Sequence, residues 1–344
     1  MAGGGHRSVF LVIAGLAVAT VVFGFILQAG LWPAEERNSA MSSEKAGIDT
    51  MPAVEQEAAA QHAGPRKVAL FEPPPGPPAY WELTHVLQSS VLDRSQVLAY
   101  YGNPDTSEMG VLGAHDFETV LHLLAEHARL YDDLNGSAGM VPAAHLVYAV
   151  AKTRPTKNGL HLQYVAQQDL ERYVQLTRER GMLLILDVQI GRSSAEVEVE
   201  KLIPYLRLPH VHLALDPEWA ARPGETPGMQ VGSLDAEDIN GVQARLQGLV
   251  VQDRLPPKIL IVHQFADSMI TRSEYIERYS GVDLVIDMDG IGPPDIKALR
   301  YSDFAAREYA HHAGVKLFFD RDPDLMSEET VLSLRPPPSV VIYQ

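Results

Sequence analysis

The chain has 344 residues, a formal net charge of −16 at pH 7 and no cysteine. This length suits one α/β barrel or two smaller domains. The negative charge, without any cluster of Lys and Arg, argues against a nucleic-acid partner. Disulfides, thiolate metal ligands and a cysteine nucleophile are excluded.

The N-terminal region contains an apolar segment. No charged residue lies between Ser8 and Trp32, and Val9 to Leu27 is almost wholly apolar, a length that crosses a bilayer as a helix. We predict a signal anchor over residues 8–32 that leaves residues 1–7 in the cytoplasm and the C-terminal domain outside the cell membrane. A cleaved signal peptide is the alternative, since Leu27-Gln28-Ala29 resembles a cleavage site.

Residues 33–79 are rich in Ala, Glu, Ser and Pro and show no sustained helical or strand period. The segment ends in a proline run, Pro73 to Pro78, that favours polyproline II. It is predicted to be a disordered linker without a partner of its own. The folded domain is then expected over residues 80–344.

Beyond Tyr80, short apolar runs alternate with stretches of helical period, a pattern typical of βα units and a parallel sheet. Eight runs are predicted to be strands: Val97 to Tyr101, Ala144 to Val150, Leu183 to Val188, Val211 to Leu215, Ile259 to Val262, Leu284 to Met288, Val315 to Phe319 and Val340 to Tyr343. Eight parallel strands predict a closed (β/α)8 TIM barrel. An open doubly wound sheet is the alternative, although Gly102-Asn103-Pro104 is not the glycine-rich turn of a nucleotide-binding fold.

The helical segments fit between these runs. They are Asp116 to Leu134, Gln168 to Arg180, Ala195 to Leu206, Asp235 to Gln252, Ser273 to Tyr279, Ser302 to His312 and Ser327 to Leu334. Seven crossovers join eight strands, so Tyr80 to Leu92 is expected to take the place of an eighth outer helix. His127, His311 and His312 are expected to be ordinary helix or surface residues.

Strand side chains alternate between the two faces, so sequence parity separates the barrel interior from the helix-facing side. In the fourth strand His212, Ala214, Asp216 and Glu218 alternate with aliphatic residues and are predicted to face the interior. The same parity aligns Asp187 with Gln189, His263 with Phe265, Asp283 with Asp287 and Asp289, and Lys316 with Phe318 and Asp320. Charged side chains thus gather at the C-terminal strand ends, where barrel enzymes build their active sites. Each of them alone could instead pair with a neighbour or cap a helix.

Asp216-Pro217-Glu218 resembles the Asp-x-Glu at the end of strand four in muramidase-like and chitinase-like (β/α)8 glycoside hydrolases. The resemblance implies that Glu218 is the general acid and that Asp216 orients it or steadies developing positive charge. Asp320 falls where many such barrels keep their nucleophile, and a second carboxylate, from Asp287, Asp289 or Asp320, is expected ~5 to 10 Å from Glu218. The acidic residue that the muramidase-like pattern has after strand one is replaced here by Tyr101-Gly102-Asn103-Pro104.

A carbohydrate of the cell envelope or the extracellular space is the predicted substrate, without a metal or other cofactor. Substrate-binding candidates are Asp187, Gln189, His263, Tyr101, Tyr148, Trp219 and Arg192. The aromatic rings among them could stack on sugars. Arg192 could clamp an anionic substrate or pair with Asp187.

Two other classes of function stay open. A metal-dependent hydrolase would use some of His145, Asp187, His212, His263, Asp287 and Asp289 as ligands, although the His-x-His typical of strand one in metallo-hydrolase barrels is absent. A non-catalytic carbohydrate-binding or envelope-associated barrel would need no such chemistry.

Overall fold

The computed structural model describes residues 89–305 and 307–344. The predicted signal anchor, the predicted linker and the first residues of the predicted domain lie outside these residues. Within the described part of the chain, no helix is long and apolar enough to span a bilayer.

Eight parallel strands close into a barrel. Each strand pairs in parallel with its neighbours, and the last pairs with the first. In order round the ring they are β1 (Ser95–Gly102), β2 (Gly139–Ala151), β4 (Leu183–Gly191), β5 (Val211–Ala220), β7 (Lys258–Gln264), β9 (Val282–Met288), β10 (His312–Leu317) and β11 (Val340–Tyr343). A short strand, β3 (Leu162–Tyr164), adds antiparallel to β2. The closed ring confirms the predicted barrel and excludes the open sheet.

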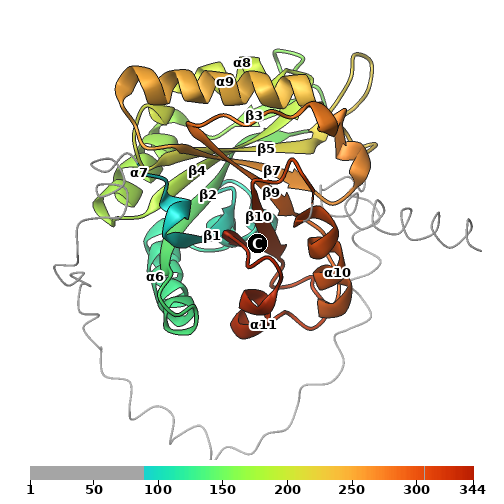
Figure 1. Ribbon diagram of the computed structural model, residues 1–344. Helices are drawn as coiled ribbons and strands as arrows, with labels where there is room; N and C mark the ends of the chain where they lie inside the picture. The colour runs from blue at the N-terminus through green and yellow to red at the C-terminus, as the bar shows by residue number, and fades with distance from the viewer. Residues whose placement is uncertain (1–88, 306) are drawn as a thin grey trace, which may run out of the picture. The chain divides into compact units, whose positions relative to one another are not determined.

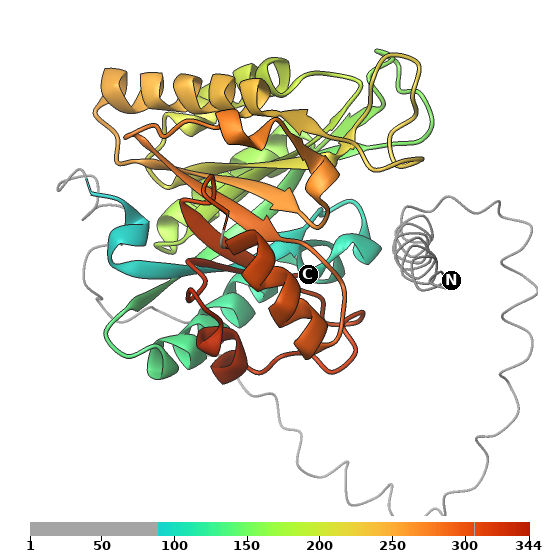
Figure 2. The same cartoon turned by 45° about the vertical axis from the view of Figure 1, so that its right-hand side comes forward.

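Helices surround the strands (Figures 1 and 2). They are α6 (Phe117–Leu134), α7 (Gln167–Glu179), α8 (Ala195–Leu206), α9 (Ala236–Asp253), α10 (Pro294–Ala305) and α11 (Glu328–Ser333), with a short α5 (Val111–Ala114) after β1. Several begin where a side chain accepts a hydrogen bond from the first turn, as Asp116, Ser194 and Ser327 do. Such caps satisfy backbone donors that have no partner inside the helix.

The predicted helix over Ser302 to His312 is displaced. Helix α10 begins at Pro294 and ends at Ala305, and His312 is the first residue of β10. Proline is favoured at the first helical position because the missing N–H would have no helical partner there. The proline pair at 293–294 therefore starts this helix.

His127 also differs from expectation, because it is buried.

The predicted helix over Ser273 to Tyr279 is wrong. Between β7 and β9 the chain forms only the short elements η3 (Asp267–Met269), β8 (Ile270–Thr271) and η4 (Ser273–Tyr275). Strand β8 pairs in parallel with β6 (Leu234–Asp235), just ahead of α9.

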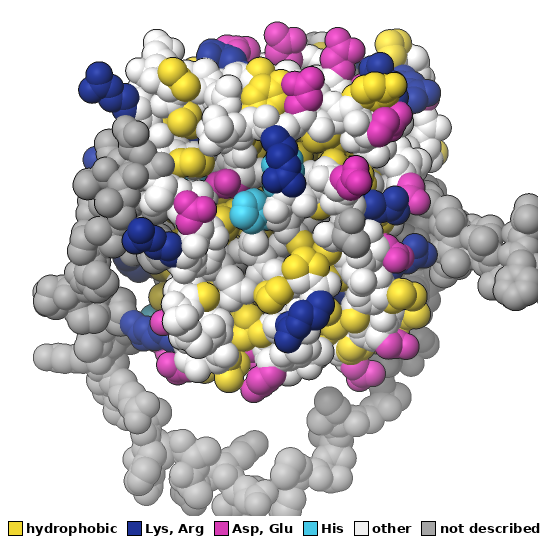
Figure 3. All heavy atoms as spheres, in the orientation of Figure 1, with side chains coloured by type: hydrophobic (Ala, Val, Ile, Leu, Met, Phe, Trp, Pro, Cys, Tyr) yellow, Lys and Arg dark blue, Asp and Glu magenta, His cyan; other side chains and the backbone are white. Residues whose placement is uncertain are grey.

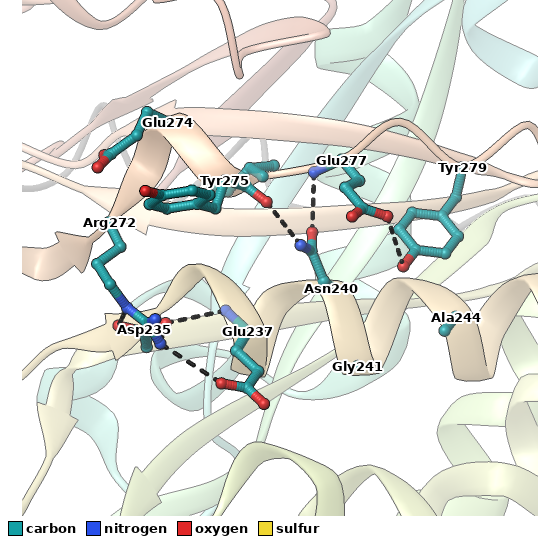
Figure 4. A pocket seen from close by; sticks show the side chains of 11 residues that line it. Asp235, Glu237, Asn240, Gly241, Ala244, Arg272, Glu274, Tyr275, Glu277 and Tyr279 are labelled. Atoms are coloured by element: carbon teal, nitrogen blue, oxygen red, sulfur yellow. Dashed lines mark hydrogen bonds and ion pairs between the residues drawn. The ribbon is translucent and has the colours of Figure 1, made fainter.

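Amide side chains of α9 replace the hydrogen bonds that this helix would have made. Asn240 Nδ2 donates to the Tyr275 carbonyl at 2.8 Å, and Asn240 Oδ1 accepts from the Glu277 amide at 3.0 Å (Figure 4). Gln243 Nε2 donates to the Glu277 carbonyl at 3.0 Å. These side-chain hydrogen bonds hold the 275–277 segment against α9 in an extended conformation.

The barrel interior is apolar toward the N-terminal ends of the strands. The buried side chains that share this position are Val97, Ala99, Val141, Ala143, Leu183, Ile185, Ala214, Ile259, Ile261, Val285, Val340 and Ile342. Val91, from the 3-10 turn η1 (Val91–Asp93), packs with them. The described end of the predicted Tyr80 to Leu92 segment thus packs with the interior cluster rather than as an outer helix.

Candidate active site

Polar side chains replace the apolar ones at the C-terminal end of the barrel interior. They come from β2, β4, β5, β7, β9 and β10 and from the residue directly after β9. We call them the polar cluster: His145, Asp187, Asp216, Glu218, His263, Asp287, Asp289 and Lys316. All are buried, and Glu218 is the most accessible, at 9%. The parity of the strands therefore places groups far apart in sequence beside one another.

His263 lies between two carboxylates. Its Nε2 is 3.2 Å from Asp187 Oδ2, and its Nδ1 is 2.8 Å from Asp287 Oδ2. His145 Nε2 lies 3.0 Å from the same oxygen of Asp187. Burial alone would lower the pKa of His263, but its hydrogen bonds to the two carboxylates outweigh burial and raise this pKa well above its usual value. The two carboxylates therefore favour the charged form of His263.

Lys316 is a second buried basic residue. Its Nζ lies 3.0 Å from Asp289 Oδ2 and 3.7 Å from the ring centroid of Tyr101. Burial opposes its charge, yet the carboxylates of Asp289, Asp216 and Asp287 raise its pKa further. The Tyr101 ring adds a cation–π contact. Tyr101 thus belongs beside the polar cluster, as predicted.

The carboxyl groups of Asp216 and Glu218 have no ion-pair partner within the described residues. Burial, together with the charges of Asp187 and Asp289, raises the pKa of Asp216 to about 7. Burial and the charges of Asp216 and Asp289 raise the pKa of Glu218 well above its usual value, and Lys316 and His263 offset this only in part. A carboxyl group whose pKa is raised in this way can act as an acid near neutral pH.

Four carboxylate oxygens of the polar cluster are buried without a hydrogen-bond partner among the described residues. They are Oδ1 of Asp187, Asp216, Asp287 and Asp289. A buried acceptor without a partner costs about 1 to 3 kcal/mol, and more when it is charged. Buried acceptors without a partner are typical of sites that bind a ligand or catalyse a reaction.

Gly314 makes room for this arrangement. It lies opposite Asp287 in the β10–β9 pairing. A Cβ atom at this position would lie 2.9 Å from Asp287 Oδ1 and 3.2 Å from Asp287 Cα. Sequence analysis missed Gly314, although a glycine inside a strand often marks the close approach of another group.

The structure does not bring Asp320 into the polar cluster, which corrects the prediction for this residue. Strand β10 ends at Leu317, and the chain then turns, so the strand alternation does not extend to Asp320, which is exposed. The buried carboxylate of this turn is Asp322, whose Oδ2 lies 2.9 Å from Lys297 Nζ. Asp283, at the opposite end of β9, accepts a hydrogen bond from Ser90 Oγ.

Two predicted substrate-binding residues face elsewhere. Tyr148 packs in the layer between strands and helices, with its ring centroid 5.5 Å from that of Tyr164. Arg192 Nε donates to the Glu225 carbonyl at 2.6 Å, so it holds the loop after β5 rather than pairing with Asp187. Tyr148 lies three residues after the interior-facing His145 in β2, so strand alternation places it on the helix-facing side. The contact of Arg192 depends on a loop that the sequence alone did not define.

The remaining predicted residues have structural contacts. Gln189 is buried, and its Oε1 accepts from the Ala151 amide at 2.8 Å. Trp219, half-buried at the end of β5, packs on Gly228, where a Cβ would lie 2.7 Å from Trp219 Cζ3. His212 Nδ1 accepts from the Ile259 amide at 3.0 Å, near the N-terminal end of β7. His212 is therefore not part of the polar cluster.

A separate hollow of about 660 Å³ lies on the outer wall between α9 and the 272–279 segment (Figure 4). It includes none of the polar cluster residues.

On the face drawn in Figure 3, Lys and Arg side chains stand singly among acidic ones rather than in a continuous basic patch. The exclusion of nucleic acid remains a prediction.

Fold and site together define a (β/α)8 barrel with a buried carboxylate and imidazole cluster at its C-terminal end. No family model and no curated protein sequence matches the chain. Two solved structures show a distant similarity to the chain. One is a GH18 chitinase from Pseudoalteromonas aurantia, with 9% identity and a TM-score of 0.37, over 72% of this chain and 93% of that one. The other is the YdhT protein from Bacillus subtilis, with 11% identity and a TM-score of 0.39, over 79% and 87%. Likenesses this distant carry no weight for function, and the barrel rests on its own strand order.

Proposed function

We propose that the chain is a hydrolase of glycosidic bonds in which Glu218 is the general acid. The observation that carries this proposal is the carboxyl group of Glu218, which is buried without an ion-pair partner among the described residues and whose pKa is raised by burial and by the charges of Asp216 and Asp289. Glycoside hydrolases need one carboxyl group that holds its proton and a second that is ionised. We assign the first of these roles to Glu218.

Asp289 is the proposed second carboxylate. It lies on the far side of β7 from Glu218, and Lys316 Nζ supplies a positive charge 3.0 Å from its Oδ2. In the proposed reaction Glu218 gives its proton to the glycosidic oxygen as the C–O bond breaks, and the leaving sugar departs as an alcohol. Asp289 stabilises the positive charge that develops at the anomeric carbon. Water then adds its hydroxyl to this carbon, and its proton returns to the carboxylate of Glu218.

The proposed substrate is a carbohydrate of the cell envelope or the extracellular space. This extends the prediction that residues 8–32 anchor the protein in the cell membrane with residues 80–344 outside. External protease added to intact cells should then remove the barrel and leave an N-terminal fragment. A barrel that is degraded only after the cells are lysed would contradict this location.

The activity itself is tested with the purified full-length protein on a panel of envelope polysaccharides, by measuring new reducing ends. Wild-type protein should release them, and Glu218→Gln should not. Glu198→Gln, the same change in a glutamate that is also buried but lies on α8 outside the polar cluster, is the matched control. If no polysaccharide in the panel is cleaved, or if Glu218→Gln cleaves as fast as the wild type, the proposal fails.

A further inference from the structure

Three possible ligand atoms of the polar cluster lie close together. They are Nε2 of His145, Oδ2 of Asp187 and Nε2 of His263, all within 4.8 Å of one another. Asp187 Oδ2 lies 3.0 Å from the first nitrogen and 3.2 Å from the second. A tetrahedral ion with bonds of about 2.0 to 2.1 Å separates its ligand atoms by about 3.3 Å. The two separations from Asp187 are therefore close to those that such an ion requires.

The surroundings of His263 strengthen this point. Its other ring nitrogen, Nδ1, lies 2.8 Å from Asp287 Oδ2. Histidines that bind metals almost always donate their second N–H to a carboxylate or a carbonyl, which fixes the ring and leaves Nε2 free for the ion. Asp287 is thus placed to orient His263 toward Asp187.

A second group of possible ligands, His263 with Asp287 and Asp289, is less suitable. Lys316 Nζ already lies 3.0 Å from Asp289 Oδ2 and supplies the positive charge there. By contrast, no lysine or arginine pairs with Asp187 among the described residues, and its second oxygen, Oδ1, is buried without a hydrogen-bond partner, as are Oδ1 of Asp287 and Asp289. The first group is therefore the one in which no lysine competes with an ion.

We propose that His145, Asp187 and His263 form a binding site for one divalent ion of the Zn²⁺ type, with Asp287 as the residue that orients His263. Two imidazoles and one carboxylate suit Zn²⁺ and Co²⁺, whereas Mg²⁺ and Ca²⁺ prefer sites made only of oxygen. Three protein ligands leave a fourth position for water or substrate. Ion binding replaces the protons that these side chains share in the ion-free protein.

The site is tested by metal binding, which does not depend on the proposed function. Full-length protein is stripped with a chelator and titrated with Co²⁺. The visible absorption of Co²⁺ depends on the number of ligands around the ion and therefore reports binding to the site. About one equivalent should bind, and Zn²⁺ should displace it. Asp187→Asn and His145→Gln should each abolish the absorption, and Asp287→Asn should weaken affinity by about 10- to 100-fold.

His127→Gln is the matched control, because His127 is also buried but lies outside the polar cluster. Thermal melting of each variant shows which ones fold, and Glu218→Gln should keep full Co²⁺ binding. Absence of Co²⁺ binding by the wild type, or equal binding by folded His145→Gln and wild type, would overturn the metal site. Neither outcome would bear on cleavage by Glu218, which the polysaccharide assay measures separately.

Discussion

The two halves of the barrel interior differ although the same strands line both. Toward the N-terminal ends the interior is filled by aliphatic side chains such as Ile185, Ile261 and Val285. Two residues further along, the same faces carry Asp187, His263 and Asp287. The apolar half stabilises the ring and fixes the strands, and the polar half uses those fixed positions for chemistry. Substitutions in the polar half should therefore lower activity more than stability, and substitutions in the apolar half should lower stability more than activity.

The largest effect is expected for Glu218→Gln. Loss of general acid catalysis should lower kcat/KM by about 10²- to 10⁴-fold. The melting temperature should stay the same or rise, because removal of an unpaired buried acid relieves its cost. Kinetics and thermal melting on the same sample check this pair of results. A lower melting temperature with unchanged kcat/KM would reverse the roles assigned to the two halves.

Ile261→Ala should show the opposite pattern. It removes a fully buried side chain from the apolar half and leaves a cavity, so the free energy of unfolding should fall by about 2 to 5 kcal/mol. The activity per folded molecule should change little. Denaturant titration measures the first quantity and active-site titration the second.

Gly314→Ala should affect both stability and the polar cluster. The added methyl group would meet Asp287, and overpacking of this kind costs about 1 to 3 kcal/mol. Because the displaced group is the carboxylate that holds His263, Co²⁺ binding should weaken along with stability. Gly241→Ala, where no neighbour lies within 4 Å of the added Cβ, serves as the control.

The pH dependence of kcat/KM should shift when one charged side chain near Glu218 is removed. Activity should fall on the basic side as Glu218 loses its proton, at a pH well above the usual range for glutamate. The Asp216 charge raises the pKa of Glu218, so Asp216→Asn should move this basic limb to lower pH. Lys316 lowers that pKa, so Lys316→Met should move the limb to higher pH. Profiles of kcat/KM measure both directions, and shifts of the same sign would contradict the assignment of the limb to Glu218.

The smallest effect is expected at the outer wall. Asn240→Ala removes two exposed hydrogen bonds to the backbone of the 275–277 segment, and should lower the free energy of unfolding by about 0.5 to 1.5 kcal/mol. Hydrogen exchange should increase in that segment, while activity and metal binding remain unchanged. A loss of activity as large as that of Glu218→Gln would mean that this wall belongs to the active site.

Sequence periodicity predicted the ring of strands and its polar end because both depend on local alternation. Asp187, Asp216, His263 and Asp287 could be placed in this way. What failed depended on contacts between distant segments. The 273–279 segment is held extended by Asn240 and Gln243, and no local pattern shows this. Asp320 was misplaced because β10 ends three residues earlier.

The central claim is that Glu218 protonates the leaving group, and leaving-group dependence tests it most directly. Glu218→Ala and wild type are compared on a cleaved polysaccharide and on a matching dinitrophenyl glycoside, whose leaving group departs without a proton. The account predicts a large loss of kcat on the polysaccharide and a much smaller one on the dinitrophenyl glycoside. Equal losses on the two substrates would contradict it.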